Sequence, residues 1–297
     1  MNHRLGRLVG SGATADVYEY GKGKVIKLYK QGSLIDPVQW EYGKALSVCK
    51  SILSAPKVYE LIEMDNSYGI VMEQVRGETL NSIINESMQQ LVAGDISLEA
   101  FAEQILTMVR LTAQSLYDLH SRKPSKEFET MDTRLMRDVN ENQFLTANEK
   151  NDVISIIESL PKGNSVCHGD PNPNNILVND DHYRFIDWVN AGIGNPMYDI
   201  AEYILLSIPN KKALENLPAI LIDFFERYGE SISRTFLTEY EKLSEIDTDS
   251  YKDWQIPLLV SKLNSNRTME EKEQILENIR ERIRNKKRKN IKVEHKR

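Results

Sequence analysis

The chain has 297 residues, of which 40% are hydrophobic and 28% are charged, so it can bury a sizeable core and is not a disordered polypeptide. Its two cysteines, Cys49 and Cys167, exclude a disulfide scaffold and an all-cysteine zinc module. No apolar run approaches the roughly 18 residues that cross a membrane, and the first residues do not have the pattern of a signal peptide, so we expect a cytoplasmic protein.

The first 75 residues are predicted to form short strands around one helix. Stretches rich in β-branched and aromatic residues, separated by Gly or Asn-Ser turns, mark the strands, which are Leu5–Val9, Val17–Tyr20, Lys24–Tyr29, Tyr59–Met64 and Tyr68–Glu73. The helix is predicted from Pro37 to Lys50, since proline is favoured at the first helical position. Its apolar face carries one acid, Glu41.

The pattern becomes helical after a short connector near Gln74–Gly77. Apolar residues at three- and four-residue spacing predict helices over Leu98–His120 and Ala147–Leu160. Strand-like segments return at Ile176–Val178 and Tyr183–Ile186, and the rest of the chain is mostly helical. The connector is the best boundary in the chain, which predicts two lobes on a hinge.

The end of the chain differs in charge from the rest. The net charge is −6, yet residues 280–297 are rich in lysine and arginine, so residues 1–279 are more acidic than the total indicates. A basic segment can bind nucleic acid or an anionic membrane, but it is more often a solvated helix end. We therefore expect a basic tail outside any active site, and no nucleic-acid partner.

A glycine-rich turn, Gly10-Ser11-Gly12-Ala13-Thr14-Ala15, lies between the first two predicted strands. Glycine leaves room for backbone N–H groups to approach a phosphate. The signal is weak alone, because a glycine turn in a hairpin is more often only a turn. It is not a Walker loop, since no Gly-Lys-Ser/Thr follows.

Lys27 lies on the same face of its strand as Val25 and Tyr29. It is either a solvated edge lysine or a cation that clamps the phosphates of a nucleotide. In the second interpretation Glu41 is its natural partner, because an unpaired acid on the inward face of a helix would be costly.

The strongest signal is the segment His168-Gly169-Asp170-Pro171-Asn172-Pro173-Asn174-Asn175, followed by Asp187 at the end of the next strand. An acid, an amide and a second acid in this order suit phosphoryl transfer. Asp170 can take or orient a hydroxyl proton, while Asn175 and Asp187 supply hard oxygen ligands for the Mg²⁺ of ATP. Turn chemistry alone is the other explanation, but the spacing and the flanking apolar strands disfavour it.

These motifs in this order resemble the aminoglycoside phosphotransferase and choline kinase family, within the protein-kinase-like fold. The loop has H-G-D-x-x-x-x-N and I-D-W, where protein kinases have H-R-D-x-x-x-x-N and D-F-G. Residues 194–201, G-N-P-M-Y-D-I-A, are similar to the family's G-D-P-x-x-D-L-A. The departures from protein kinases are Ala15 in place of a third glycine and Asn172 in place of a lysine. The resemblance is clear over residues 5 to 210.

The resemblance implies an α+β, bilobal protein-kinase-like fold, with a small antiparallel-sheet N-terminal lobe and a larger, mainly helical C-terminal lobe. It divides the chain into a nucleotide-binding lobe over 1–75, a catalytic and acceptor-binding lobe over 76–279 and the basic tail over 280–297, with both lobes in one phosphotransferase domain. It implies ATP or GTP and Mg²⁺ as cofactors. The reaction is then transfer of the γ-phosphoryl group to a hydroxyl of a small molecule, such as an aminoglycoside, an amino-alcohol or a sugar.

The family pattern also predicts how each lobe contacts the nucleotide. Apolar side chains cover the base from both lobes, the connector supplies a carbonyl at Glu73 and an N–H at Val75, and the glycine-rich turn covers the phosphates. The predicted nucleotide-binding residues are Val9, Gly10, Ser11, Gly12, Val17, Val25, Lys27, Glu41, Glu73, Val75, Leu177 and Ile186.

The acceptor is predicted to be a small molecule, because the segment from Trp188 to Asn195 is too short for the activation loop on which peptides dock. The segment Ser121–Lys162 is the kind of insertion that shapes acceptor specificity in relatives, and the acidic body favours a cationic acceptor. Asp199 has two interpretations of equal weight. It either stabilises the start of its helix or holds the loop of Asp170 by hydrogen bonds.

Three other functions stay open: a nucleotide-binding pseudokinase, an atypical protein kinase, and a kinase or ATPase associated with tRNA modification. A pseudokinase is expected to lack one of Lys27, Asp170, Asn175 and Asp187, and all four are present.

Two further side-chain groups have a structural and a functional interpretation. Cys167 beside His168 could be a thiol nucleophile, but a buried small residue is favoured. The aromatic residues Trp254, Tyr251 and Tyr240 could form a cage for a quaternary amine, but their spacing is more typical of a helical core.

Overall fold

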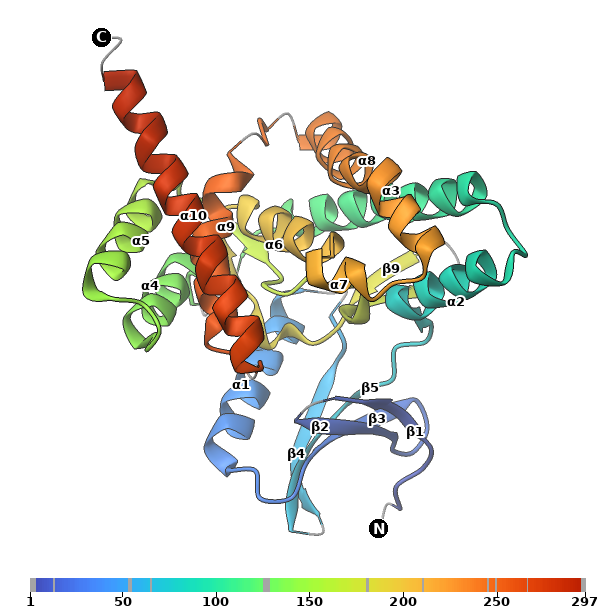
Figure 1. Cartoon of the computed structure of the whole chain (residues 1–297). Coiled ribbons are helices and arrows are strands. Elements are labelled where there is room, and N and C mark those ends of the chain that lie inside the picture. Colours follow the sequence, from blue (N-terminus) through green and yellow to red (C-terminus); the bar gives the residue numbers. More distant parts are fainter. Residues whose placement is uncertain are drawn as a thin grey trace.

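The computed structural model has a lobe built around a sheet and a larger lobe built of helices (Figure 1). It describes residues 4–12, 14–52, 55–64, 66–124, 129–179, 182–209, 211–244, 246–248, 250–265 and 267–294. No helix in these ranges combines the length and apolar character that a membrane crossing needs. The α+β, bilobal fold expected from the sequence is confirmed.

Five antiparallel strands form the sheet of the N-terminal lobe. In sheet order they are β1 (Leu8–Ser11), β2 (Ala15–Glu19), β3 (Lys24–Tyr29), β5 (Ser67–Glu73) and β4 (Val58–Met64). Lys27 pairs with Val17 on one side and with Ile70 on the other, so these three side chains share a face. Helix α1 (Ile35–Ser51) packs Val38 against that face.

The ends of these elements depart from the sequence prediction where pairing or packing sets them. Strand β1 covers Leu8–Ser11 instead of Leu5–Val9, because Leu8 pairs with Tyr18 and Ser11 pairs with Asp16. Partner strands rather than β-propensity decide where this edge strand begins.

The C-terminal lobe contains nine helices among the residues that the structure describes. They are α2 (Leu80–Ala93), α3 (Leu98–His120), α4 (Met131–Glu141), α5 (Ala147–Ser159), α6 (Met197–Ser207), α7 (Lys211–Glu215), α8 (Ala219–Ser244), α9 (Tyr251–Leu263) and α10 (Met269–Glu294). Two small sheets accompany them. One has the strand order β6 (Glu78–Thr79), β8 (Ile176–Asn179) and β9 (His182–Phe185), and the other pairs β10 (Gly192–Gly194) with β7 (Ser165–Cys167).

The core of this lobe lies where α3, α6, α8 and α9 meet. Side chains such as Phe101, Ile200, Phe236 and Trp254 are almost fully buried there. Helix α3 begins where the Ser97 hydroxyl accepts a hydrogen bond from the Ala100 N–H, at 3.1 Å. The core therefore supports α6, the helix that carries Asp199.

The expected basic tail begins at Arg280, within a long helix. Helix α10 runs without a break through this point, and it buries Ile279 and Ile283. Its basic residues face acids of the body: Arg280 bonds Glu149 at 2.6 Å and Lys287 bonds Asp152 at 2.7 Å. Lys286 likewise lies 2.7 Å from Asp253 on α9, the helix that α10 crosses in Figure 1, so basic residues of α10 pair with acids of both α5 and α9.

Candidate active site

Lys27 lies between two carboxylates from different parts of the chain. Its Nζ is 2.7 Å from Oε1 of Glu41 on α1 and 3.2 Å from Oδ1 of Asp187 in the C-terminal lobe. Burial alone would lower the pKa of Lys27, but the charges of Asp187 and Glu41 outweigh it and raise that pKa, so the side chain stays cationic. The predicted Lys27–Glu41 contact is present, and the Asp187 contact joins the two lobes.

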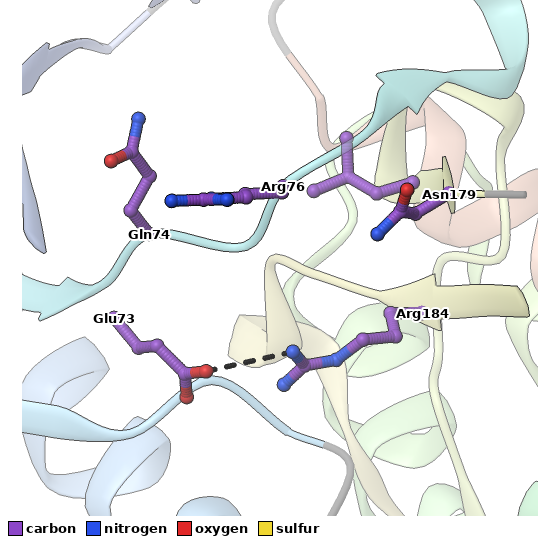
Figure 2. Close-up of a pocket in the computed structure, with 6 residues that line it drawn as sticks. Glu73, Gln74, Arg76, Asn179 and Arg184 are labelled. Carbon is purple, nitrogen blue, oxygen red and sulfur yellow. Dashed lines mark ion pairs between the residues drawn. The ribbon is translucent and has the colours of Figure 1, made fainter. Parts of the chain in front are cut away.

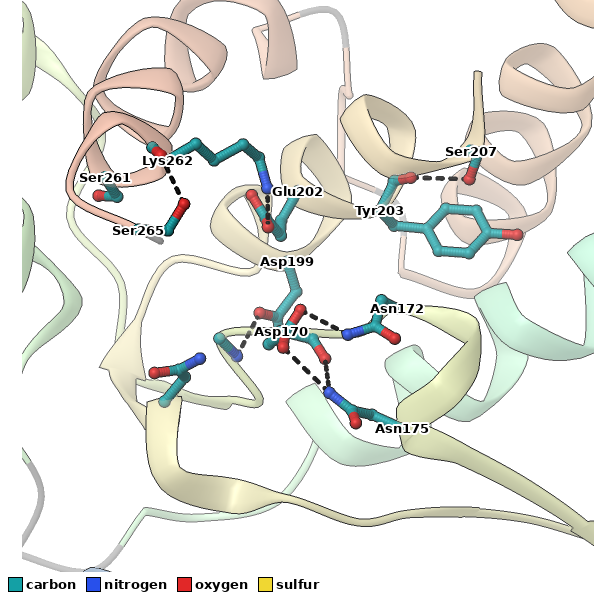
Figure 3. A network of polar contacts seen from close by, with 12 residues as sticks. Asp170, Asn172, Asn175, Asp199, Glu202, Tyr203, Ser207, Ser261, Lys262 and Ser265 are labelled. Carbon is teal, nitrogen blue, oxygen red and sulfur yellow. Dashed lines mark hydrogen bonds and ion pairs between the residues drawn. The ribbon is translucent and has the colours of Figure 1, made fainter. Parts of the chain in front are cut away.

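The carboxylate of Asp170 is oriented by two asparagines of the same loop (Figure 3). Nδ2 of Asn172 donates to Oδ1 at 2.8 Å, and Nδ2 of Asn175 donates to Oδ2 at 3.0 Å and to the Asp170 carbonyl at 3.0 Å. Asn172 also accepts from the Asn174 N–H, which closes the loop into the 3₁₀ turn Pro173–Asn175. Local side-chain chemistry therefore fixes the direction of the Asp170 carboxylate.

Asp199 holds this loop from beneath. It is fully buried in the first turn of α6, and its two oxygens accept from the His168 N–H at 2.6 Å and the Gly169 N–H at 2.8 Å. His120 contacts the same carboxylate at 3.0 Å and the Tyr240 hydroxyl at 2.7 Å. Asp199 also lies as an acid in the first turn of α6, where its charge suits the helix N-terminus. The structure therefore shows the loop contacts of one interpretation together with the helix position of the other.

Gly169 is required by the path of the loop. Its φ is +81°, and a Cβ at this position would meet the Asn190 carbonyl oxygen at 2.1 Å. Arg134 on α4 fixes Asn190 with two hydrogen bonds, at 2.8 Å to its carbonyl and at 2.7 Å to its side chain. Because the Asn190 carbonyl approaches the backbone so closely, the residue between His168 and Asp170 cannot carry a side chain.

His168 is a bracing residue. Its Nε2 lies 3.0 Å from the Ile186 carbonyl, so this nitrogen carries the proton, and Nδ1 accepts from the Asp170 N–H at 3.3 Å. Burial lowers the pKa of His168, which suits the neutral form that both contacts need. The ring packs against Phe185 and Trp188.

Asp187 follows the strand that His168 braces. Its backbone is left-handed, with φ 59°, a conformation that aspartate tolerates better than most residues. The Ile186 N–H donates to the Asn175 carbonyl at 2.9 Å, so the backbones that carry Asn175 and Asp187 are joined directly. The structure thus brings together Asp170, Asn175 and Asp187, as the sequence predicted.

The side-chain oxygens of Asn175 and Asp187 fit a magnesium ion. Asn175 uses its amide nitrogen on Asp170, which leaves Oδ1 as the atom able to bind a cation, and Asp187 is 38% exposed at its side chain. Amide and carboxylate oxygens are the ligands that Mg²⁺ prefers.

A cavity of about 430 Å³ lies beside the connector (Figure 2). Two predicted residues, Glu73 and Leu177, line it with Gln74, Arg76, Asn179 and Arg184, which the sequence reasoning missed. Arg184 bonds Glu73 across the lobes at 3.5 Å. Arg184 pairs with Leu177 in the hairpin of β8 and β9, but no local pattern in the sequence predicts its contact with Glu73.

The N–H groups of Glu73 and Gln74, next to the predicted connector groups, are used within the N-terminal lobe. The Glu73 N–H donates to the Lys57 carbonyl at 2.7 Å, and the Gln74 N–H donates to the Gly23 carbonyl at 3.0 Å. The Val75 N–H makes no hydrogen bond to another described residue. An N–H group that binds a nucleotide base must be unoccupied in this way.

Four predicted apolar residues, Val9, Val17, Val25 and Ile186, do not line the cavity beside the connector. Val17 and Val25 are on the face of the sheet that carries Lys27, and Val9 is 44% exposed.

The glycine-rich turn is closed by its own contacts. The Gly12 N–H donates to the Ala15 carbonyl at 2.9 Å, and the Ser11 hydroxyl donates to Asp16 at 2.5 Å. Gly10 pairs with Val17 in the sheet. Ala13, also part of the predicted turn, lies outside the described residues.

The thiol and the aromatic cage do not form sites. Cys167 is fully buried, and burial raises the pKa of its thiol well above the usual value, which opposes a nucleophilic role. Trp254 and Tyr240 are also buried, and the Tyr240 hydroxyl is occupied by His120. These residues are core, as their spacing favoured.

The molecule has a sheet lobe and a helical lobe, joined by a lysine between two acids, and a loop with an oriented aspartate. This arrangement defines a phosphotransferase of the protein-kinase-like class. The chain belongs to the phosphotransferase enzyme family, whose model matches residues 6–246.

Solved structures of aminoglycoside phosphotransferases share this fold at low sequence identity. APH(4)-Ia has a TM-score of 0.62 and 13% identity, with 95% of this chain and 93% of that chain covered. The GDP and kanamycin complex of APH(2")-IIia has a TM-score of 0.55 and 14% identity, with 96% and 95% covered. The streptomycin–ATP–APH(2")-IIa ternary complex has a TM-score of 0.54 and 15% identity, with 94% and 91% covered.

A curated relative matches one segment only. Protein LicA of Haemophilus influenzae is 33% identical over 75 residues, which are 25% of this chain and 26% of that protein. The chain therefore matches about a quarter of the length of this relative.

Proposed function

We propose that the protein transfers the γ-phosphoryl group of ATP or GTP to a hydroxyl of a small molecule, with Mg²⁺ bound at Asn175 and Asp187. The observation that carries this proposal is the oriented carboxylate of Asp170, held by Asn172 and Asn175 and anchored through Asp199. Membership of the phosphotransferase family supports it independently.

Asp170 is the group that receives the acceptor's proton. The acceptor oxygen forms a bond to the γ-phosphorus, the bond from that phosphorus to the β,γ-bridging oxygen breaks, and the hydroxyl proton passes to the Asp170 carboxylate. Both carboxylate oxygens already accept one hydrogen bond, which directs the remaining lone pairs. Positioning supplies much of the rate in such reactions.

Lys27 is the proposed phosphate clamp. Glu41 holds its ammonium at 2.7 Å in a half-buried position, and the raised pKa keeps it charged throughout the physiological range. A bound Mg²⁺ would neutralise phosphate charge next to this lysine. The Val75 N–H and the Glu73 carbonyl are proposed to bind the base. They lie at the proposed boundary between the nucleotide-binding lobe, 1–75, and the catalytic lobe, 76–279.

A small molecule is the proposed acceptor. Only η2 (Trp188–Asn190) and the three-residue strand β10 lie between Asp187 and α6, which leaves no platform for a peptide. Aminoglycosides are present in complexes of two similar structures. The acidic charge of the chain favours a neutral or cationic acceptor in the cytoplasm, where ATP and GTP are plentiful.

The direct test is a screen with labelled ATP and labelled GTP against aminoglycosides, amino-alcohols, sugars and nucleosides, with generic peptides in parallel. We expect a labelled small-molecule product from the wild-type chain and none from Asp170→Asn. Labelled peptide without any labelled small molecule would replace this proposal with a protein kinase.

A further inference from the structure

A second cavity, of about 600 Å³, lies between α6, α8, α9 and α10 in the C-terminal lobe. One face of α10 forms its wall, with Glu271, Gln274, Asn278 and Arg282 at helical spacing. Its size is within the range of sites for small organic molecules.

The cations of this cavity outnumber its acids, although the chain as a whole is acidic. Its lining contains Lys252, Lys262, Arg267 and Arg282, against the single acid Glu271. Two of these cations have carboxylate partners. Lys262 bonds Glu202 at 2.5 Å, as Figure 3 shows, and Arg267 lies 3.7 Å from Glu271.

Arg282 differs, because the groups that hold it are neutral. Its Nη1 donates to Oε1 of Gln255 at 2.6 Å, and its Nε donates to Oδ1 of Asn278 at 2.6 Å. Among the described residues, the hydrogen bonds of this guanidinium go to these two amide oxygens, and the nearby carboxylate of Asp253 is paired with Lys286. Burial lowers the pKa of Arg282, while the neighbouring Tyr251 and Glu281 act in the opposite direction.

A half-buried arginine that is held only by neutral groups retains charge that a bound anion would compensate. The two amides leave Nη2 free and fix the plane of the guanidinium, whose fork matches the oxygens of a phosphate or a carboxylate. Ile204, Leu205 and Leu259 provide apolar lining in the same cavity, which suits an organic anion better than a bare ion.

We propose that Arg282 is the centre of a binding site for the oxyanion group, phosphate or carboxylate, of a small organic molecule in the cavity between α6, α8, α9 and α10. The site does not depend on the proposed phosphoryl transfer. Lys262 nevertheless connects the cavity to α6, the helix whose first turn holds the catalytic loop.

The test is a calorimetric titration of the full chain with phenyl phosphate and, separately, with benzoate, while a non-hydrolysable ATP analogue and Mg²⁺ fill the nucleotide site. Benzyl alcohol is the uncharged probe. We expect at least one anion to bind at millimolar concentration or better, and benzyl alcohol to bind more weakly. The two anionic probes distinguish a phosphate site from a carboxylate site.

Arg282→Gln should weaken binding of the anion by about tenfold or more, since a charge-assisted hydrogen bond is lost. Arg284→Gln, at an exposed position on the same helix, is the matched control and should bind as the wild type does. Gln274→Glu adds a negative charge to the cavity wall at nearly unchanged shape, and should weaken binding even where Arg282→Gln fails to fold. Failure of both anions to bind, or equal binding by the wild type, Arg282→Gln and Gln274→Glu, would overturn the proposal.

Discussion

The loop of Asp170, residues 168–175, and the glycine-rich turn differ in how firmly the rest of the protein holds them. His168 and Gly169 are buried, and their N–H groups are bound by Asp199 from a helix of the core. The glycine-rich turn lies at an exposed edge, where Leu8 is 51% exposed and the contacts are local. The loop of Asp170 is therefore held from the core of the helical lobe, while the glycine-rich turn is held only by contacts within its own hairpin.

Removal of the anchor should have the largest effect. Asp199→Ala leaves the N–H groups of His168 and Gly169 buried without partners, and should lower the free energy of unfolding by about 3 kcal/mol, together with turnover. Ser11→Ala in the glycine-rich turn is the comparison, and should change stability by less than about 1 kcal/mol. Chemical denaturation of both variants measures the difference. Equal stability losses would remove the distinction between the two regions.

Asp170→Asn tests the chemistry proposed for the loop that Asp199 anchors. It keeps the size of the side chain but removes the proton acceptor, so turnover should fall by about 100-fold or more, with nucleotide affinity little changed. Asp118→Asn, an exposed acid on α3, is the matched control. Single-turnover kinetics and equilibrium nucleotide binding check both halves of this prediction. Normal turnover in Asp170→Asn would assign the base to another residue.

Lys27→Met tests the nucleotide side. Loss of a charged contact of this kind costs about 1.5–3 kcal/mol, so nucleotide affinity should fall by about ten- to a hundredfold while the fold persists. Lys22→Met in the exposed turn after β2 controls for loss of one positive charge. A fluorescent nucleotide titration measures the effect. Unaltered binding and turnover would show that Lys27 only joins the lobes through Glu41 and Asp187.

His168 should give the smallest effect, and one that depends on pH. Its pKa is lowered by burial in the folded protein, so below about pH 6.5 the unfolded chain binds more protons than the folded one. The free energy of unfolding should therefore decrease as the pH falls below that value. His168→Gln keeps a donor and an acceptor but does not titrate, and should show a shallower decrease. Denaturation at several pH values checks this, and parallel curves would contradict a neutral buried histidine.

Local spacing made the catalytic loop and the Lys27–Glu41 pair predictable. Asp170, Asn172 and Asn175 interact within one short segment, so the sequence contains most of the information that orients them. The role of Asp199 stayed open, because its partners His168 and Gly169 are distant in the chain, and only the fold places α6 beneath the loop.

Contacts between distant segments were the part that the sequence did not reveal. Charge composition indicated a basic helix end, but it gave no sign that Arg280 bonds Glu149 far away in the chain or that Ile283 is buried. Likewise, Arg184 looked like an ordinary strand residue, and only the approach of the two lobes brings it to Glu73. Long-range pairing of charges depends on tertiary packing, which single-sequence patterns do not encode.

Phosphorus NMR of the wild-type chain with ATP, Mg²⁺ and the best acceptor from the screen tests the central claim most directly. We expect a new phosphomonoester resonance that grows in step with ADP, and no such resonance when Asp170→Asn replaces the wild type. ADP that accumulates only with inorganic phosphate, or a phosphoryl group that ends on the protein itself, would contradict transfer to a small-molecule hydroxyl.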